Sequence, residues 1–540
     1  MAPVELKPAP HQKAELTDHY AILKWAAGSL KPLPPYIEFD QDVLIDLLTI
    51  HNLSGRFLHR LSNQTVPWVT PPLKQAALDL HSKTRRHVIE NARAVREVNR
   101  YLGDKAEIII VKGISTYILS GNDHTMRSGD IDVLCNDSDA LIGALTALGY
   151  HQSKAPFLYE IGEYSKDGIE FDIHSYFPVY TYSESLANAD LVPGRHPAIW
   201  RQSYQMQESR IFYADLKSNS YRSEASETEG LIAPNPHMLA LILCSHAFLN
   251  YTNVWSISHR EKAYVRLGEI ADLFDLADHP DFRREKFLSL VEQFNAGHAV
   301  AWAASVATSL FGKNPLPVSS TAQLDDDLPD GRFPCCLWWN FWAGLRFGAD
   351  DLLARRWLDM ALLVKQLGGN TLGTVQGVTG KYSTFDGEAT KPLRRLITLA
   401  TAEDPVPLEL EVRRSEHRLQ IDLRVMSELG GTNRVRVDFG NVATEWIHSS
   451  AGGRWSAVGA VSEMSLIKGS VDYKLRFEFS WEVLGEAIQS MSEVPVLIGV
   501  AKQSEHDGLT AGTLIPVSIN FEESLCGEEQ ACYSANPSVR

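Results

Sequence analysis

The apolar residues of the first two thirds of the chain recur mostly at helical spacing. Residues 36–61 predict a small helical region, which prolines at positions 67, 71 and 72 end. Residues 73–102 predict one long amphipathic helix with many charges opposite its apolar stripe. A polar, serine-rich segment at 184–232 predicts mainly loop. Further helices are expected over residues 236–250, 264–278, 285–311 and 337–367.

Between these helical regions, short apolar runs predict a small sheet. Strands are expected at 107–112, 130–135 and 168–174, with helices at 114–119 and 139–148 between them. The last of these strands alternates strictly, so that Ile169, Phe171 and Ile173 face one way and Glu170, Asp172 and His174 the other. One face of the sheet should therefore be polar.

The pattern changes after Gly368. A stretch rich in glycine, threonine and serine runs to about residue 391, and short alternating strands separated by turn residues follow. The clearest strands are 408–412, 419–423, 435–437, 473–477 and 494–500. Their spacing predicts a separate β-sandwich, so the whole chain is expected to be an α+β protein with a C-terminal all-β domain.

Charge and composition exclude several classes of protein. Lysine and arginine total 51 against 67 aspartates and glutamates, a net charge of −16 that disfavours binding to extended nucleic acid. The N-terminus lacks the apolar core of a signal peptide, and no run approaches the length of a membrane span, so a soluble cytoplasmic protein is expected. The 6 cysteines form no C-x-x-C pair, which favours free buried thiols over zinc or redox sites.

The most informative segment is Arg127-Ser128-Gly129-Asp130-Ile131-Asp132. On a strand, Asp130 and Asp132 point to the same face with Cα atoms about 6.6 Å apart, so both carboxylates can reach one group of divalent cations. Asp172 on the alternating strand supplies a third carboxylate. Three such acids suit two-metal phosphoryl or nucleotidyl transfer, although ordinary strand-end residues would look the same.

A second candidate site is the turn Lys112-Gly113-Ile114-Ser115, which lies between a strand and a helix. Free backbone N–H groups and a glycine there permit close approach of a phosphate, and Lys112 adds a positive charge. The chain contains no P-loop, and a Lys-Gly turn by itself is often structural.

Together these motifs resemble the uncharacterised nucleotidyltransferase family within the DNA polymerase beta superfamily, over roughly residues 36–310. The resemblance rests on Lys112-Gly113, Arg127 before Gly129-Asp130-Ile131-Asp132, a helix ending in Gly149-Tyr150, and Asp172-Ile173-His174. It implies a small mixed sheet that carries the acids, with Mg²⁺ (or Mn²⁺) and a nucleoside triphosphate in the cleft. Most of the superfamily has Gly-Ser at the first turn, where Lys112-Gly113 stands here, so the manner of holding the phosphates is open.

The resemblance also assigns roles. Asp130 and Asp132 would bind the metals, and Asp172 would complete the site as a ligand or as the acceptor's base. The residues implied for the triphosphate are Lys112, Gly113, Ser115, Arg127 and Gly129. Three weaker candidates are His174, Arg266 and Asp272.

The expected organisation follows from these patterns. It comprises an N-terminal helical region at 1–72, a nucleotidyltransferase core at 73–183, a mainly helical domain at 184–367, a linker at 368–404, a β-sandwich at 405–525 and a tail at 526–540. The stretch from Tyr473 to Gly485 weakly resembles carbohydrate-binding sandwich domains. An exposed tryptophan there would stack on a sugar, whereas core tryptophans would only pack.

The expected activity is Mg²⁺-dependent transfer of a nucleoside monophosphate from an NTP to a hydroxyl of an acceptor, with release of pyrophosphate. The acceptor is a small molecule, sugar, peptide or protein, and the β domain would recruit a glycan or peptide. Two alternatives stay open: a ligand- or carbohydrate-binding protein built on a degenerate transferase core, and a toxin-like transferase that modifies tRNA.

Overall fold

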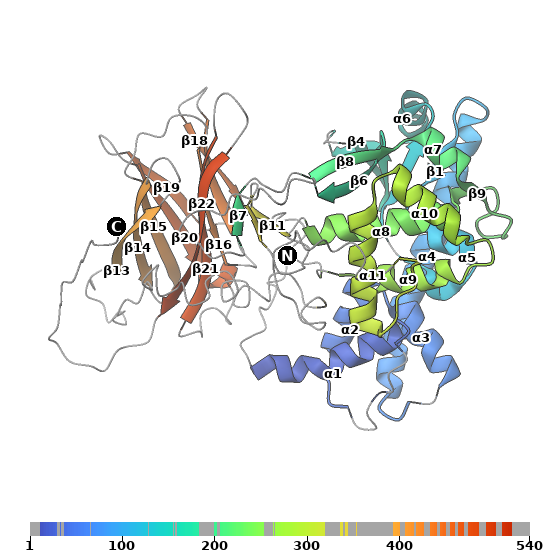
Figure 1. Ribbon diagram of the computed structural model, residues 1–540, viewed down its shortest axis with the longest axis horizontal. Coiled ribbons are helices and arrows are strands. Elements are labelled where there is room, and N and C mark those ends of the chain that lie inside the picture. Colours follow the sequence, from blue (N-terminus) through green and yellow to red (C-terminus); the bar gives the residue numbers. More distant parts are fainter. Residues whose placement is uncertain are drawn as a thin grey trace. The chain divides into compact units, whose positions relative to one another are not determined.

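The computed structural model divides the chain into two units, which meet in the sequence between Leu367 and Gly368 (Figure 1). The structure describes most of residues 11–318, the short strands at 335–343 and the strands of 393–520. The longer segments outside this description are 1–10, 183–198, 253–262, 319–334, 344–352, 354–392 and 521–540. The predicted tail and most of the predicted linker therefore lie outside the described residues.

Four helices open the first unit: α1 (His11–Ala26), α2 (Gln41–Ile50), α3 (Ser54–Asn63) and α4 (Pro71–Leu102). Helix α2 begins where the Asp40 carboxylate accepts hydrogen bonds from the N–H groups of the first turn. Helix α4 begins where Thr70 caps a first turn that contains proline. Its buried side chains recur at helical spacing, which confirms the predicted amphipathic helix.

A five-stranded mixed sheet follows, in the order β1-β2-β5-β4-β3. Its strands are β1 (Ile108–Ile110), β2 (Ile131–Cys135), β3 (His151–Lys154), β4 (Glu160–Lys166) and β5 (Ile169–His174). Strands β2 and β5 run parallel, and the other pairs are antiparallel. The helices α5 (Ser115–Ser120), η1 (Asp123–Thr125) and α6 (Ser138–Ala147) lie between these strands along the chain. The three predicted strands and two predicted helices of this region are confirmed.

One face of this sheet forms the core of the first unit. Ile131, Val133, Phe171 and Ile173 are buried in one cluster with the apolar stripe of α4 and with residues of α6. Because side chains alternate along a strand, the residues between them turn to the opposite face. That face carries Asp132, Asp172 and His174, which are polar as predicted and are themselves buried.

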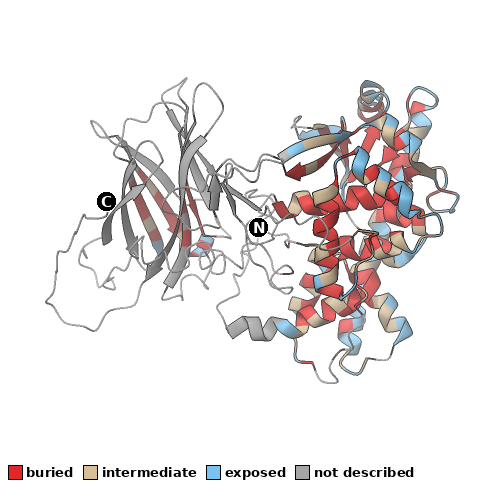
Figure 2. Ribbon diagram, viewed as in Figure 1, coloured by how far each residue is buried: buried red, intermediate tan, exposed pale blue. Residues whose placement is uncertain are grey.

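The remainder of the first unit is mainly helical. Its elements are β6 (Phe177–Tyr182), β7 (Ile199–Arg201), β8 (Met206–Ile211), α7 (Tyr213–Ser218), β9 (Ser220–Arg222), β10 (Ile232–Pro234), α8 (Pro236–Thr252), α9 (Leu267–Ala277), α10 (Arg284–Gln293), α11 (Gly297–Phe311), β11 (Cys335–Trp338) and β12 (Phe341–Ala343). Helix α8 is buried along nearly its whole length (Figure 2), because α9, α10 and α11 all pack against it.

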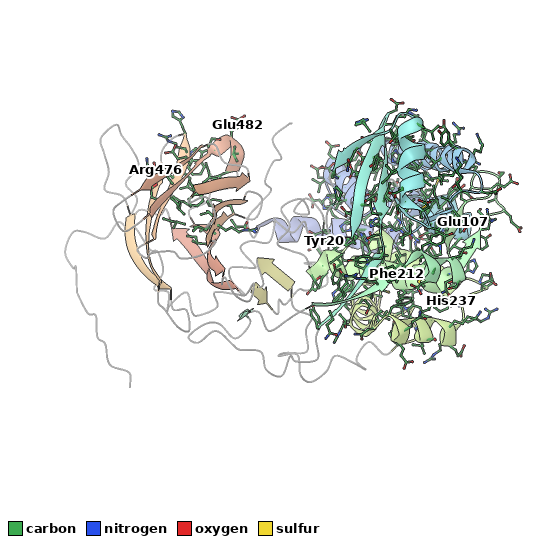
Figure 3. All side chains as sticks on the ribbon, turned by 90° about the horizontal axis from the view of Figure 1, so that it is seen from above. Tyr20, Glu107, Phe212, His237, Arg476 and Glu482 are labelled. Carbon is green, nitrogen blue, oxygen red and sulfur yellow. The ribbon has the colours of Figure 1, made fainter. Side chains whose placement is uncertain are left out.

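The prediction of mainly loop over 184–232 holds for residues 223–231 but is wrong for most of 199–222 where the structure describes this segment. Strand β8 pairs with β6, and α7 and β9 follow it. Glu107, labelled in Figure 3, holds these two elements because it accepts hydrogen bonds from Tyr213 at 2.6 Å and from Arg222 at 3.1 Å, and pairs with Lys217. These are tertiary contacts, which a local polar composition does not reveal.

Two helix predictions also need correction. Residues 285–311 form two helices rather than one continuous helix, because Asn295 adopts a left-handed φ of 50° between α10 and α11. The helix predicted over 337–367 is wrong at its start, where β11 and β12 pair as strands. Their tryptophan and phenylalanine residues favour strand. Apart from Leu353, residues 344–367 of that prediction lie outside the described residues.

The second unit contains two five-stranded antiparallel sheets, in the orders β13-β14-β15-β20-β19 and β18-β17-β16-β21-β22. The strands are β13 (Leu393–Leu399), β14 (Val406–Arg414), β15 (Arg418–Val425), β16 (Asn433–Asp438), β17 (Ala443–Ser449), β18 (Arg454–Gly459), β19 (Glu463–Lys468), β20 (Tyr473–Ser480), β21 (Glu493–Gln503) and β22 (Thr510–Asn520), with the short helix α13 (Trp481–Leu484) after β20. All five strands expected from the sequence are present, and β13 lies inside the segment that the sequence assigned to a linker.

Two aromatic side chains connect these sheets. Phe439, which follows β16, packs edge to face on Phe479 of β20 with ring centroids 4.9 Å apart. Trp481 is buried, as expected of a core residue. The face-to-face arrangement of a sandwich stays a prediction. In the part of the chain that the structure describes, no helix is both long and apolar enough to cross a membrane.

Candidate active site

The centre of the site is a pair of aspartates on neighbouring strands. Asp132 of β2 and Asp172 of β5 are register partners in the parallel pairing, so their side chains leave the sheet on the same face. Asp132 is 1% exposed and Asp172 8%. Two buried carboxylates at paired positions of neighbouring strands need a cation or hydrogen-bond donors between them.

His174 supplies one such donor. Its Nε2 atom lies 3.1 Å from Asp132 Oδ1 and 3.5 Å from Asp172 Oδ2. Burial lowers the pKa of His174, but the hydrogen bond to Asp132 and the charges of both aspartates outweigh it, so the net shift is upward. Tyr159 stacks on the imidazole with centroids 5.4 Å apart and fixes its plane.

Lys112 supplies a full positive charge. Its Nζ atom lies 2.6 Å from Asp132 Oδ1, which thereby accepts from both Lys112 and His174. Burial opposes the ionised form of both members of this ion pair. Their mutual attraction prevails, raising the pKa of Lys112 and lowering that of Asp132. The sequence placed Lys112 against a triphosphate; in the structure it is the counter-ion of an acid.

Asp172 is less well compensated. Burial raises its pKa to about 7, with His174 opposing the shift and Asp132 adding to it. Its Oδ1 atom is buried and has no hydrogen-bond partner among the residues that the structure describes. A buried carboxylate oxygen without a partner is costly and points to a missing ligand.

These three residues fit a divalent cation. One ligand atom from each of Asp132, Asp172 and His174 can be chosen so that all lie within 4.8 Å of one another. Carboxylate oxygens are the donors that Mg²⁺ prefers, and an added imidazole nitrogen also suits Mn²⁺. The partnerless Asp172 oxygen belongs to the same cluster. Asp130 is not part of it: this residue is exposed just before β2, although its charge still contributes to the raised pKa of Lys112.

The turn after β1 brings the backbone close to Asp130. Gly113 has a φ of +70°, and a Cβ atom there would lie 3.2 Å from the Asp130 carbonyl oxygen. Both facts require glycine. Ser115 is buried, and its hydroxyl donates to the carbonyls of Ile110 at 2.9 Å and Lys112 at 3.2 Å. Ser115 therefore shapes the turn, a role that the sequence did not indicate.

Arg127 lies in a buried ionic network. Its Nη2 atom pairs with Asp272 Oδ2 of α9 and donates to Thr116 at 3.2 Å, while its Nε atom has no partner in the described part of the chain. Arg56 of α3 reaches the other oxygen of Asp272 at 2.6 Å and also pairs with Asp275. Asp272, a weak candidate from sequence, therefore holds two arginines from distant parts of the chain.

Arg266 lies at the start of the same helix. It contacts Glu269 at 3.4 Å, and Glu269 also contacts His246 of α8 at 3.4 Å. Burial opposes the ionised form of Glu269, but the charges of His246 and Arg266 prevail and its pKa is lowered. Sequence reasoning missed Glu269, Arg56 and Tyr159, and only the i,i+3 spacing of Arg266 and Glu269 offered a local signal.

Comparison with known proteins identifies the class. Residues 38–312 match the family described as uncharacterised nucleotidyltransferase, and the chain belongs to this family. The match has nearly the bounds expected from the sequence motifs. It includes every residue of the acid cluster and of the Arg127 network.

No curated protein matches the chain. Among solved structures, a carbohydrate binding module family 9 (CBM9) from Caldicellulosiruptor kristjanssonii in complex with glucose shares 7% identity, with a TM-score of 0.20, over 28% of this chain and 99% of that chain. The same module in complex with cellotriose shares 10% identity, with a TM-score of 0.18, over 29% and 97% of the two chains. Scores this low support no argument about fold or ligand.

Proposed function

We propose that this protein transfers a nucleoside monophosphate from an NTP to a hydroxyl group of an acceptor, with release of pyrophosphate. The observation that carries the proposal is the in-register pair Asp132 and Asp172 with His174 between them, in a member of a nucleotidyltransferase family. The convergence of these three buried side chains supports a transferase over a degenerate core that only binds ligands.

A divalent cation is the implied cofactor. Asp132, Asp172 and His174 would hold it, since their ligand atoms converge and one oxygen of Asp172 lacks a partner among the described residues. When bound, Mg²⁺ or Mn²⁺ supplies charge neutralisation for the phosphates and for the oxygens that attack and leave.

The proposed transfer forms one bond to phosphorus and breaks another. The acceptor's hydroxyl oxygen forms a bond to the α-phosphorus, and the bond from that phosphorus to the bridging oxygen of the β-phosphate breaks. The hydroxyl proton goes to a carboxylate, for which Asp130 and Asp172 are the candidates. Lys112 neutralises Asp132, and its ammonium would be free to neutralise the departing pyrophosphate once the acids have another counter-ion.

Equilibrium binding tests the proposal. Each of the four NTPs is titrated calorimetrically, with and without Mg²⁺, into the native protein and two variants. The first variant is Asp132→Asn, and the second is the matched control Asp139→Asn, which replaces an exposed carboxylate on α6. We expect Mg²⁺-dependent binding of at least one NTP to the native protein and the control, and its loss in Asp132→Asn. Absence of NTP binding to the native protein would overturn the proposal.

A further inference from the structure

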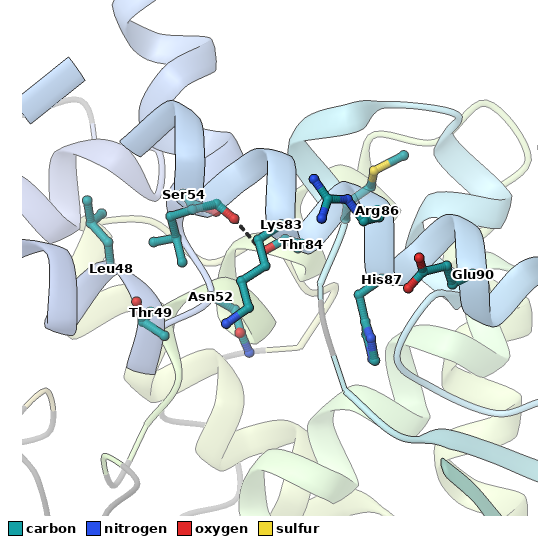
Figure 4. Close-up of a pocket in the computed structure, with 11 residues that line it drawn as sticks. Leu48, Thr49, Asn52, Ser54, Lys83, Thr84, Arg86, His87 and Glu90 are labelled. Carbon is teal, nitrogen blue, oxygen red and sulfur yellow. Dashed lines mark hydrogen bonds between the residues drawn. The ribbon is translucent and has the colours of Figure 1, made fainter. Parts of the chain in front are cut away.

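A cavity of about 460 Å³ lies between α4 and the residues that follow α2, beside the segment that precedes Asp130 (Figure 4). Helix α4 forms one wall with Lys83, Arg86 and His87, and the end of α2 with the residues after it contributes Thr49 and Asn52. In Figure 4 the Lys83 side chain extends toward Asn52. This volume is in the range of pockets that hold small molecules.

Residues of the α4 wall form hydrogen bonds to the segment that precedes Asp130. His87 Nε2 lies 3.1 Å from the carbonyl oxygen of Gly129, and the Asn91 side chain donates to the same oxygen at 3.0 Å. Gly129 directly precedes Asp130. Met126, at the other end of the same short segment, also lines the cavity. A molecule in the cavity would therefore lie next to the segment that carries Asp130.

The cavity carries positive charge that the described residues do not neutralise. Neither Lys83 nor Arg86 forms an ion pair with any residue that the structure describes, whereas their neighbour Arg85 is bound to Glu227 at 2.8 Å. Glu90, four residues after Arg86, is the one acid among the lining residues and offsets one of the two positive charges. In a chain with a net charge of −16, the positive charge that remains at the rim of this hollow favours an anionic ligand.

We propose that this cavity binds the acceptor of the transfer, a small hydroxylated molecule that carries a phosphate group. Lys83 and Arg86 hold the phosphate, while Thr49 and Asn52 offer polar contacts to the remainder, so that a hydroxyl can be presented to the Asp130 segment. The assignment of the ligand as acceptor rests on the proposed function; the phosphate site itself does not.

The charge pattern of α4 favours a small molecule over RNA. Beyond the cavity, Glu90 and Glu97 interrupt the positive charges of Arg93, Arg96 and Arg100 on the helix. This interruption and the net charge of −16 disfavour a ligand that follows the helix as an extended polyanion.

Calorimetric titration with inorganic phosphate tests the site. The variants are Lys83→Ala/Arg86→Ala and the matched control Arg93→Ala/Arg100→Ala on the same helix. Because the first pair removes both charge-assisted contacts to the phosphate, we expect it to weaken phosphate binding at least about tenfold and the control to leave it unchanged. Native protein that does not bind millimolar phosphate, or equal binding by all three proteins, would overturn the proposal.

Two further measurements separate the possible failures. Mg²⁺-dependent NTP binding by the same variants should be unchanged. If the native protein binds phosphate through Lys83 and Arg86 but binds no NTP, the proposed function fails and the phosphate site stands. Glycerol 3-phosphate should bind more tightly than glycerol, and only in proteins that keep both cations. If a short RNA binds through these residues while glycerol 3-phosphate does not, the acceptor class is wrong.

Discussion

The guanidinium of Arg127 forms a buried ion pair with the carboxylate of Asp272, although 145 residues separate them in the sequence. Arg127 lies three residues before Asp130, and Asp272 lies on α9. The pair therefore ties the segment that enters β2 to the helical part of the first unit. The same carboxylate holds Arg56 of α3, so three distant segments meet at one side chain.

Replacement of Asp272 should be strongly destabilising. Asp272→Asn leaves two buried guanidinium groups without their shared counter-ion, and breaking such a pair typically costs about 3–5 kcal/mol. Urea denaturation measures the loss. Asp278→Asn, at an exposed position that follows the same helix, should change the unfolding free energy by less than about 0.5 kcal/mol. Equal effects of the two variants would show that the network contributes little.

Lys112→Met tests whether a cation belongs in the acid cluster. Removal of the ammonium leaves Asp132 without its closest positive charge, which destabilises the protein. Mg²⁺ or Mn²⁺ should restore part of this loss, because a ligand that binds the folded state stabilises it. We therefore expect a larger metal-induced rise in melting temperature for the variant than for the native protein. A metal response that is the same or smaller would argue against a cation site at these residues.

Gly113 and Gly121 form a matched pair. Both have positive φ, +70° and +64°, but a Cβ at Gly121 would meet no atom within 4 Å, whereas one at Gly113 would lie 3.2 Å from Asp130 O. Alanine at either position should cost about 1–2 kcal/mol from backbone strain. Only Gly113→Ala should also displace the Asp130 segment and weaken Mg²⁺-dependent NTP binding. Calorimetric titration measures NTP binding by both variants, and equal affinities would contradict this reasoning.

His51 predicts a dependence of stability on pH. Its Nε2–H donates to the carbonyl of Leu353 at 3.0 Å, and its Nδ1 accepts from the N–H of Leu267 at 3.3 Å. Burial lowers its pKa to about 4, with the charge of Arg266 adding to the shift and the hydrogen bond to Leu353 opposing it. Between pH 6.5 and about 4 the unfolded chain therefore binds a proton that the folded protein does not.

Stability should accordingly fall as the pH falls through this window, by up to about 1.4 kcal/mol per pH unit from this group. Urea denaturation of the native protein and His51→Gln across the window measures the contribution. The native protein should lose more stability than the variant on acidification. Parallel pH profiles would mean that His51 does not titrate in this way.

The sequence predicts those parts of the site that depend on local periodicity. The alternation in β2 and β5 placed Asp132, Asp172 and His174 on one face, and the structure brings these three together. Asp130 shares the same alternation but lies outside the strand, where the alternation no longer fixes its direction.

The remaining features depend on contacts between distant segments. Neither the pairing of Arg127 with Asp272 nor the stacking of Tyr159 on His174 leaves a trace in local spacing. The strands β11 and β12 were missed for a related reason: the periodicity of a short apolar run does not distinguish a strand from a buried helix until its pairing partner is known.

The most direct test of the central claim follows the label of the nucleotide. The protein is incubated with Mg²⁺, a phosphorylated hydroxyl compound such as glycerol 3-phosphate, and each NTP labelled with ³²P at the α- or the γ-phosphate. Transfer of a nucleotide predicts that the α-label enters the acceptor while the γ-label leaves in pyrophosphate. It also predicts that Asp132→Asn and Asp172→Asn abolish the transfer of the α-label and the release of labelled pyrophosphate. Entry of the γ-label into the acceptor, or native levels of α-label transfer by the two variants, would contradict the account.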